Sequence, residues 1–302
     1  LGGDSTAQQA HRAGGASAES CRGRIGRGSC ADRWAPESCV QEVRIISQLA
    51  LIMGASSGVG AATAKELSRR GWTVVLSARS EDRLASLAQS IGPNASYKAC
   101  DATLSSDVAE LEAFVRRRHG IPDVVINCAG LGQWKRLQDT TPDELRLMIG
   151  SPYLAAANAS RMFLSDMLDR RSGTLIHVNS PACYMAWPSA VGYTASRFAL
   201  RGLHEALSQD LAGSGVGTCH VVFGRIDSEY FDHNPGAAER MPGIAAIIRI
   251  LAVDECADVL ADVAAKPRKL VVHPSMLRFF YWINLVAPWL TRWLLRVTGA
   301  RS

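Results

Sequence analysis

Three closely spaced glycines are the first feature of this 302-residue sequence with the character of a ligand site. They form the pattern Gly54-x-x-x-Gly58-x-Gly60, between an apolar run typical of a strand and a segment with helical periodicity. Glycine allows positive φ angles and lets the backbone approach a ligand closely. The start of the following helix offers unpaired N–H groups and the positive end of its dipole. We therefore expect phosphate groups to bind at Gly54, Ser56, Ser57, Gly58, Val59 and Gly60.

The same turn also satisfies the pattern Gly-x-Ser-x-Gly, which presents a nucleophilic serine in α/β-hydrolases. Ser56 would be that nucleophile. It follows the first strand of the expected domain, however, so no earlier strands would be present to build a hydrolase sheet. A glycine-rich turn without any ligand is the other alternative. The position of the turn between a strand and a helix favours phosphate binding over both.

Tyr193 and Arg197 are a second pair of chemical interest. Residues four apart on a helix lie on the same face, one turn away from each other. A phenol has a pKa of about 10 and needs a nearby cation to exchange its proton near neutral pH. Ser180 lies upstream, at the end of an apolar run. Taken singly, a helical tyrosine is usually a packing residue and a serine after a strand a cap, so the interpretation depends on their combination.

Short apolar strands alternate with amphipathic helices from Val43 onward. The predicted strands are Ile45–Met53, Thr73–Ala78, Ser96–Cys100, Val124–Asn127, Thr174–Asn179, Val216–Val222 and Leu270–His273. The predicted helices are Val59–Arg70, Glu81–Ser90, Ser105–Arg118, Thr141–Arg171, Gly192–Leu211 and Glu255–Ala264. This alternation indicates βαβ units and a parallel sheet covered on both faces. We expect a single α/β domain over residues 43–275, with a doubly wound parallel sheet of about seven strands.

In this order and spacing, the motifs resemble the short-chain dehydrogenase/reductase family from about Gln48 to His273. The three-residue gap between Gly54 and Gly58 matches the family's glycine pattern, and Ser180, Tyr193 and position 197 match its Ser…Tyr-x-x-x-Lys spacing. Further matches follow the third, fourth and sixth strands: Asp101, Asn127-Cys128-Ala129-Gly130 and Phe223-Gly224-Arg225-Ile226. The resemblance implies a Rossmann-like oxidoreductase with a nicotinamide cofactor, assembled as a homodimer or homotetramer.

The resemblance also implies roles for individual residues. Tyr193 would be the general acid/base, with Ser180 polarising the substrate carbonyl and Arg197 in the place of the lysine. Asp101 would bind the adenine, and Asn127 would steady the central sheet near the cofactor. The full set of implied cofactor contacts beyond the glycine turn is Arg79, Asp101, Ala102, Asn127, Ala129, Gly130, Tyr193, Arg197, Gly224 and Ile226.

The end of the second strand indicates which nicotinamide cofactor is used. An NAD-specific enzyme carries an acidic residue there, which accepts a hydrogen bond from the ribose 2′-hydroxyl. This sequence has Ala78 followed by Arg79. A guanidinium can bind a 2′-phosphate through two parallel hydrogen bonds. We therefore expect NADP(H). The alternative is that Arg79 is a solvated arginine at the end of a strand, with no role in binding.

Two positions depart from the family pattern. The lysine has become Arg197, which keeps the positive charge but does not release a proton at any working pH. Alignment through residues 141–145 places Pro152 where the family has an asparagine that holds a relay water, and a proline interrupts a helix. The sequence is therefore consistent with direct reprotonation of Tyr193 from solvent, or with a catalytically silent NADP(H)-binding protein that acts as a sensor or assembly partner.

Two segments suggest the nature of the substrate. Residues 227–250, with Tyr230, Phe231 and Met241, suit an apolar lid, and Met185 and Trp187 would line the same cleft. We expect a hydrophobic ketone, aldehyde or alcohol as the small-molecule partner. Residues 276–297 form an aromatic tail with interspersed arginines, expected either to lie on a membrane surface or to pack over the cleft or a dimer partner.

Composition excludes several other classes. The net charge is only +5, and the longest basic block is Arg116–Arg118, so nucleic acid is not an expected partner. The eight cysteines show no zinc spacing and are expected to be free thiols in a reducing compartment, with no metal bound. We expect a cytoplasmic protein with membrane association through the tail. Residues 1–42 contain few large apolar side chains and are expected to be disordered or a non-native extension.

Overall fold

A parallel sheet of seven strands forms the centre of the computed structural model, which describes residues 47–230, 232, 234, 236, 237 and 239–299. The strand order is β3-β2-β1-β4-β5-β6-β7, and each neighbouring pair is parallel. The strands are β1 Leu49–Met53, β2 Thr73–Ala78, β3 Ala95–Ala99, β4 Val124–Asn127, β5 Gly173–Asn179, β6 Val216–Phe223 and β7 Leu270–His273. The predicted fold class is confirmed. The prediction for residues 1–42 lies outside the described residues.

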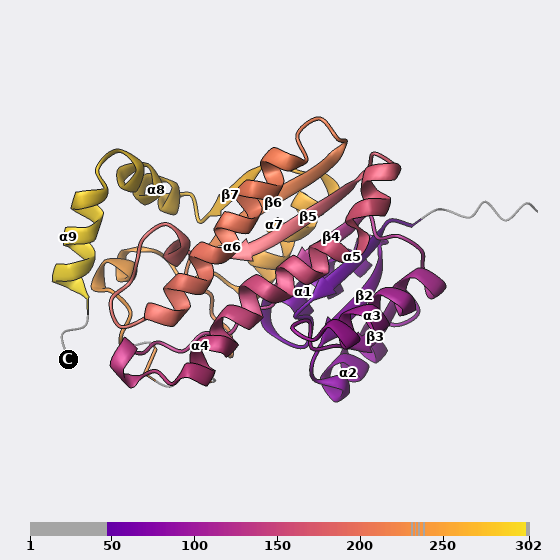
Figure 1. The fold of residues 1–302 in the computed structure, drawn as a ribbon, viewed down its shortest axis with the longest axis horizontal. Coiled ribbons are helices and arrows are strands. Elements are labelled where there is room, and N and C mark those ends of the chain that lie inside the picture. The colour runs from indigo at the N-terminus through magenta and orange to yellow at the C-terminus, as the bar shows by residue number, and fades with distance from the viewer. Residues whose placement is uncertain (1–46, 231, 233, 235, 238, 300–302) are drawn as a thin grey trace, which may run out of the picture. The chain divides into compact units, whose positions relative to one another are not determined.

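Nine longer helices follow or connect these strands within the described part of the chain (Figure 1). They are α1 Gly58–Arg69, α2 Glu81–Ile91, α3 Ser105–Arg118, α4 Pro142–Ile149, α5 Ala155–Asp169, α6 Val191–Asp210, α7 Val253–Ala265, α8 Met276–Val286 and α9 Pro288–Thr298. Short 3-10 turns occur at Leu137–Asp139, Pro181–Cys183 and Gly243–Ile247. The helices that follow successive strands cover both faces of the sheet, as expected of right-handed crossovers.

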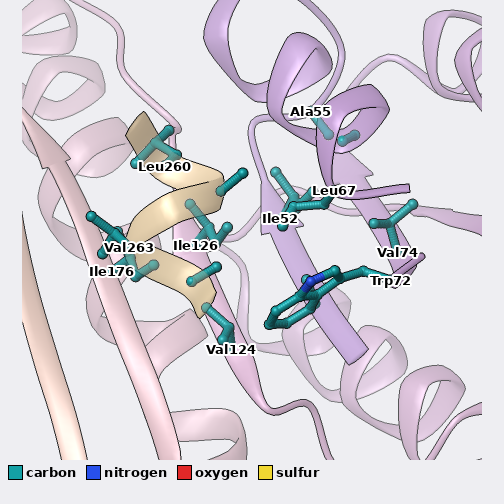
Figure 2. Packing of buried hydrophobic residues seen from close by; sticks show 14 of the residues in the cluster. Ile52, Ala55, Leu67, Trp72, Val74, Val124, Ile126, Ile176, Leu260 and Val263 are labelled. Carbon is teal, nitrogen blue, oxygen red and sulfur yellow. The ribbon is translucent and has the colours of Figure 1, made fainter. Parts of the chain in front are cut away.

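Alternation along the strands divides the core into two layers. Ile52 and Ile126 face α1, α2 and α7, where they pack with Leu67 and Leu260 (Figure 2). The neighbouring positions on these strands face α3, α5 and the end of α6 and pack around Phe163. Both faces of the sheet are therefore buried, which explains why the strands read as continuous apolar runs in the sequence.

The long helix predicted over Thr141–Arg171 is interrupted in the structure. Helix α4 ends at Ile149, a π-helical segment spans Gly150–Leu154, and α5 begins at Ala155. Pro152 lies buried inside the π-helical segment. Proline has no N–H to donate to the helix ladder and its ring clashes with the preceding turn, so the α-helical pattern is broken at this point. The interruption expected from Pro152 is confirmed, and the single helix is corrected to two.

The C-terminal segment forms the helix pair α8 and α9, which lies at the opposite end of the fold from β2 and β3 (Figure 1). The two helices belong to the same compact unit as the sheet. None of the helices in the described residues has the length and apolar content needed to cross a membrane. The described cysteines, Cys100, Cys128, Cys183, Cys219 and Cys256, are free thiols.

Candidate active site

One cavity of about 900 Å³ extends from the glycine turn to the C-terminal helices. It lies at the carboxyl ends of the strands, at the position between β1 and β4 where the strand order reverses. All but one of the residues predicted to bind cofactor or take part in chemistry line it: Gly54, Ser56, Ser57, Gly58, Val59, Gly60, Arg79, Asp101, Ala102, Ala129, Gly130, Ser180, Tyr193, Arg197, Gly224 and Ile226.

Asn127 is the exception. It is the last residue of β4, where it pairs in register with Met53 on β1 and His177 on β5. Its side chain is buried, and neither its Oδ1 nor its Nδ2 has a hydrogen-bond partner among the described residues. The structure therefore does not bring Asn127 to the cavity, in contrast to Ala129 and Gly130 just beyond it.

The glycine turn has the shape of a phosphate cradle. A Cβ atom on Gly60 would lie 2.2 Å from the carbonyl oxygen of Gly54, so only glycine allows the start of α1 to fold back onto the turn. Ser57 is the N-cap residue of α1, but its side chain makes no capping hydrogen bond, and the first turn of the helix has no acidic residue. The helix N-terminus therefore remains available to an anion, which fits a cofactor pyrophosphate.

Asp101 and Arg79 line the adjoining part of the cavity. Burial raises the pKa of the Asp101 carboxyl, but hydrogen bonds from Thr103 and the nearby charge of Arg79 outweigh it and hold this pKa below its ordinary value. The Thr103 hydroxyl donates to Asp101 Oδ1 at 2.7 Å and the Thr103 backbone N–H donates at 3.0 Å. Asp101 is therefore an ionised carboxylate held in place by Thr103, and the neighbouring Arg79 is a cation that can bind a phosphate.

Tyr193 and Arg197 occupy one face of α6, as the four-residue spacing predicted. The Arg197 guanidinium carbon lies 4.9 Å from the centre of the Tyr193 ring, and both residues are less than a tenth exposed. The guanidinium also lies against Gly130, where an added Cβ would come within 2.7 Å of Arg197 Nη2. The phenol and its cation are thus held together at the cavity wall, next to the loop that follows β4.

Asn179 joins Ser180 to Arg197. The backbone N–H of Ser180 donates to Asn179 Oδ1 at 2.9 Å, and Asn179 Nδ2 donates to the backbone carbonyl of Arg197 at 3.1 Å. Asn179 Nδ2 also lies 3.0 Å from His220 Nε2. Because Nδ2 only donates, His220 Nε2 must be an unprotonated acceptor. A buried amide and a neutral histidine therefore fix the loop that carries Ser180 against the helix that carries Arg197.

Comparison with known proteins agrees with this geometry. The family model described as short chain dehydrogenase matches residues 48–236, which is more than half of the chain. The chain belongs to the short-chain dehydrogenase/reductase family. Its sequence and its architecture both place it among these oxidoreductases, and the resemblance drawn from the motifs is confirmed.

Individual relatives support the same assignment. An uncharacterized oxidoreductase of Staphylococcus saprophyticus is 32% identical over 189 residues, which cover 62% of this chain and 77% of the relative. A metagenomic short-chain oxidoreductase solved in complex with NADP has a TM-score of 0.63 and 28% identity, and covers 75% of this chain and 96% of its own. A short-chain dehydrogenase/reductase from Burkholderia phymatum, solved with NAD, shares the fold with a TM-score of 0.71 at 23% identity, over 82% and 95% of the two chains.

In this short-chain dehydrogenase an aromatic box surrounds Tyr193. The ring centres of Trp134, Trp187 and Tyr230 lie 5.6, 6.4 and 6.5 Å from that of Tyr193. The Trp134 indole N–H donates to the Tyr230 hydroxyl at 3.1 Å, and this hydroxyl donates to the Gly132 carbonyl at 3.2 Å. Trp134 was missed by the sequence analysis. Its position four residues after Gly130, in the loop that follows a cofactor strand, is the signal that could have found it.

The far end of the cavity is mainly apolar. Met185, Trp187, Tyr230 and Met241 line it as predicted, whereas Phe231 lies outside the described residues. Leu277, Phe280 and Leu295 from the C-terminal helices also line it. The alternative in which the tail packs over the cleft is therefore confirmed for one face of α8 and α9.

Gly132 leaves the space that the Tyr193 ring occupies, because an added Cβ would lie 2.1 Å from Tyr193 Cδ2. We predict that Gly132→Ala lowers the free energy of unfolding by roughly 1–3 kcal/mol, the usual cost of overpacking. Gly202→Ala is the matched control, since Gly202 lies on the exposed side of α6 with nothing within 4 Å, and it should stabilise the protein by up to about 1 kcal/mol. Urea unfolding followed by tryptophan fluorescence measures both; equal stability of the two variants would contradict the box geometry.

Three buried histidines lie behind the Ser180 loop. His177 and His220 are register partners on β5 and β6, and the His204 ring from α6 lies 5.7 Å from His177 and 5.0 Å from His220. Burial lowers the pKa of His177 to about 3 and that of His204 to about 4, and holds the pKa of His220 well below its ordinary value. The cluster is therefore neutral in the folded protein, as the acceptor role of His220 requires.

The histidine cluster predicts a loss of stability in mild acid. In the unfolded chain a histidine binds a proton below about pH 6.5, whereas the folded protein keeps His177 neutral down to much lower pH. The unfolded state then binds more protons, so the free energy of unfolding falls by up to about 1.4 kcal/mol per pH unit for each such histidine. The free energy of unfolding, measured with urea at several pH values between about 6.5 and about 5, should change less steeply with pH for His177→Gln than for the unsubstituted chain. The same pH dependence in both proteins would contradict a neutral buried His177.

Proposed function

We propose that this enzyme is an NADP(H)-dependent oxidoreductase that interconverts a hydrophobic ketone or aldehyde and the corresponding alcohol. One observation carries the proposal: Tyr193, Arg197 and Ser180 line the same cavity as the Gly54–Gly60 turn. A proton donor, a permanent cation and a carbonyl-polarising hydroxyl thus lie along one continuous space that begins with a phosphate cradle.

The residues present fit a dinucleotide with a 2′-phosphate. The turn from Gly54 to Gly60 and the start of α1 would hold the pyrophosphate. Asp101 would bind the adenine, and Arg79 would bind the 2′-phosphate in two hydrogen bonds. The proposal for NADP(H) is supported by Ala78, which leaves no carboxylate at the end of β2 for a ribose 2′-hydroxyl, and by the NADP complex of the metagenomic relative.

When bound, the nicotinamide supplies or accepts the hydride, and the chain's own residues manage the proton. In the reduction, the Ser180 hydroxyl hydrogen-bonds the substrate carbonyl oxygen and withdraws charge from the carbon. The Tyr193 hydroxyl donates its proton to the same oxygen as the carbon gains the hydride, which leaves an alcohol and a phenolate. The guanidinium of Arg197 stabilises that phenolate from one helical turn away.

Reprotonation of Tyr193 follows a different route in this chain from that of an enzyme with a lysine at position 197. An arginine side chain, unlike a lysine, does not exchange its proton during turnover, so position 197 offers no relay group. Pro152 provides no side-chain donor or acceptor where the family has an asparagine. We propose that water reaches Tyr193 directly through the cavity and returns the proton after each turnover. The substrate is proposed to be apolar because the far end of the cavity is lined by Met185, Trp187 and Met241.

Loss of the phenol should separate chemistry from binding. Tyr193→Phe is predicted to lower the ketone-dependent oxidation of NADPH by at least about 100-fold, because it removes the proton donor, while the affinity for NADPH stays within a few-fold. Tyr97→Phe, on β3 and away from the cavity, is the control with unchanged rate. Absorbance of NADPH measures turnover and fluorescence titration measures binding, over a panel of apolar ketones and aldehydes. NADPH binding without turnover of any carbonyl by the unsubstituted chain would favour the silent sensor or assembly partner instead.

Arg197→Lys tests the proton relay in the same assay. A gain in rate supports impaired reprotonation in the unsubstituted chain, and a loss in rate shows that the reaction of this enzyme depends on the arginine.

Arg79 should determine the choice between the two cofactors. Arg79→Ala is predicted to weaken NADPH binding by at least about tenfold, because one charge-assisted pair to the 2′-phosphate is lost, and to leave NADH binding unchanged. Arg83→Ala, in α2 and also at the cavity, is the matched control for a general change of charge and should have the smaller effect. Equal loss for both cofactors would contradict the assignment of the 2′-phosphate to Arg79.

A further inference from the structure

The helix pair α8 and α9 exposes an apolar face of unusual size for a surface element. Phe279, Trp282, Leu285, Val286, Trp289 and Trp293 are each between 54% and 81% exposed. Three of the seven tryptophans of the chain belong to this face. Large exposed apolar surface is costly in water and marks a place where a protein meets a partner or a membrane.

The opposite side of the same two helices is a wall of the cavity. Leu277 and Leu295 are only 2% and 5% exposed and line the cavity together with Phe280 and Thr291. The Thr291 hydroxyl donates to Asn284 Oδ1 at 2.6 Å, and the Asn284 amide donates to the Tyr184 carbonyl at 3.2 Å, which ties α9 and α8 to the segment after Ser180. The exposed face therefore lies across one helix layer from the apolar end of the cavity.

The charged residues of the C-terminal segment indicate which kind of partner covers the exposed face of α8 and α9. Residues 276–302 contain no aspartate or glutamate, and Arg278, Arg292 and Arg296 are exposed beside the tryptophans. Tryptophans at headgroup depth with arginines reaching the phosphates are typical of helices that lie in a membrane interface. A second copy of the chain fits less well, because a two-fold contact through this face would bring the same arginines together.

We propose that α8 and α9 dock the protein on an anionic lipid surface, from which an apolar carbonyl substrate enters the cavity past Leu277, Phe280 and Leu295. The pair would lie along the surface, since neither helix is long enough to cross a bilayer. The entry of substrate rests on the proposed oxidoreductase function, whereas the docking stands on the helix pair alone.

Flotation of the full chain with lipid vesicles tests the docking without any enzyme assay. The protein should float with vesicles of phosphatidylcholine and phosphatidylserine and only weakly with phosphatidylcholine alone. The triple variant Trp282→Ser, Trp289→Ser, Trp293→Ser should bind the vesicles at least about tenfold more weakly, because it loses the apolar contact with the lipid. Arg292→Gln with Arg296→Gln should lower binding to the anionic vesicles about fivefold per arginine. Leu137→Ser, at an exposed apolar site outside both helices, is the control and should float like the unsubstituted chain.

Three results would overturn the proposal: no flotation with anionic vesicles, equal flotation of the triple tryptophan variant, or a dimer in sedimentation that the tryptophan substitutions dissociate while vesicles bind neither form. For the entry step, the triple variant should lose turnover of a long-chain ketone dissolved in vesicles and keep that of a short, water-soluble ketone. Equal loss for both ketones would contradict entry from the lipid. Absence of turnover with every ketone, in the unsubstituted chain that still floats, would contradict the proposed function and leave the docking supported.

Discussion

The common direction of the strands is the constraint on which the site depends. Because neighbouring strands are parallel and in register, their carboxyl ends meet at one edge of the sheet, and each is followed there by a loop. The cavity is lined by residues that are spread from position 54 to position 224 of the sequence: Gly54, Arg79, Asp101, Ala129, Ser180 and Gly224. A strand in the opposite direction would remove its loop from this edge and with it one part of the site.

Side-chain packing and one buried amide hold the proposed catalytic residues in place at this edge of the sheet. Tyr193 lies in a box of aromatic rings that fixes its orientation, and Arg197 lies against its face with its Nε buried and without a partner in the described part of the chain. Asn179 holds Ser180 and Arg197 at opposite ends of one amide. A buried charge is tolerated when neighbouring groups and a bound ligand satisfy it, so this arrangement suits a cofactor that brings its own acceptors to Arg197.

The fold and the residues that line the cavity near the glycine turn could be predicted because their signals are local. Apolar runs, the glycine turn and Arg79 each have a meaning that depends on a few neighbouring residues. The aromatic box could be predicted only in part: Trp187 and Tyr230 were expected to line the cleft, but their packing with Trp134 around Tyr193 joins loops that only the fold brings together. The histidine cluster likewise depends on the register of β5 with β6, which sequence periodicity does not specify. Asn127 shows the reverse case: its motif was recognised, but the structure leaves Asn127 out of the residues that line the cavity.

The most direct measurement is a crystal structure of the chain with NADP(H) and an apolar ketone bound. We predict the pyrophosphate at the start of α1, the 2′-phosphate on Arg79, and the ketone oxygen within hydrogen-bond distance of both the Tyr193 and Ser180 hydroxyls. The ring of Trp134 should remain packed on Tyr193 rather than occupy the substrate position. A cofactor bound with its nicotinamide away from Tyr193, or a ketone that reaches neither hydroxyl, would contradict the assignment of the chemistry to these residues.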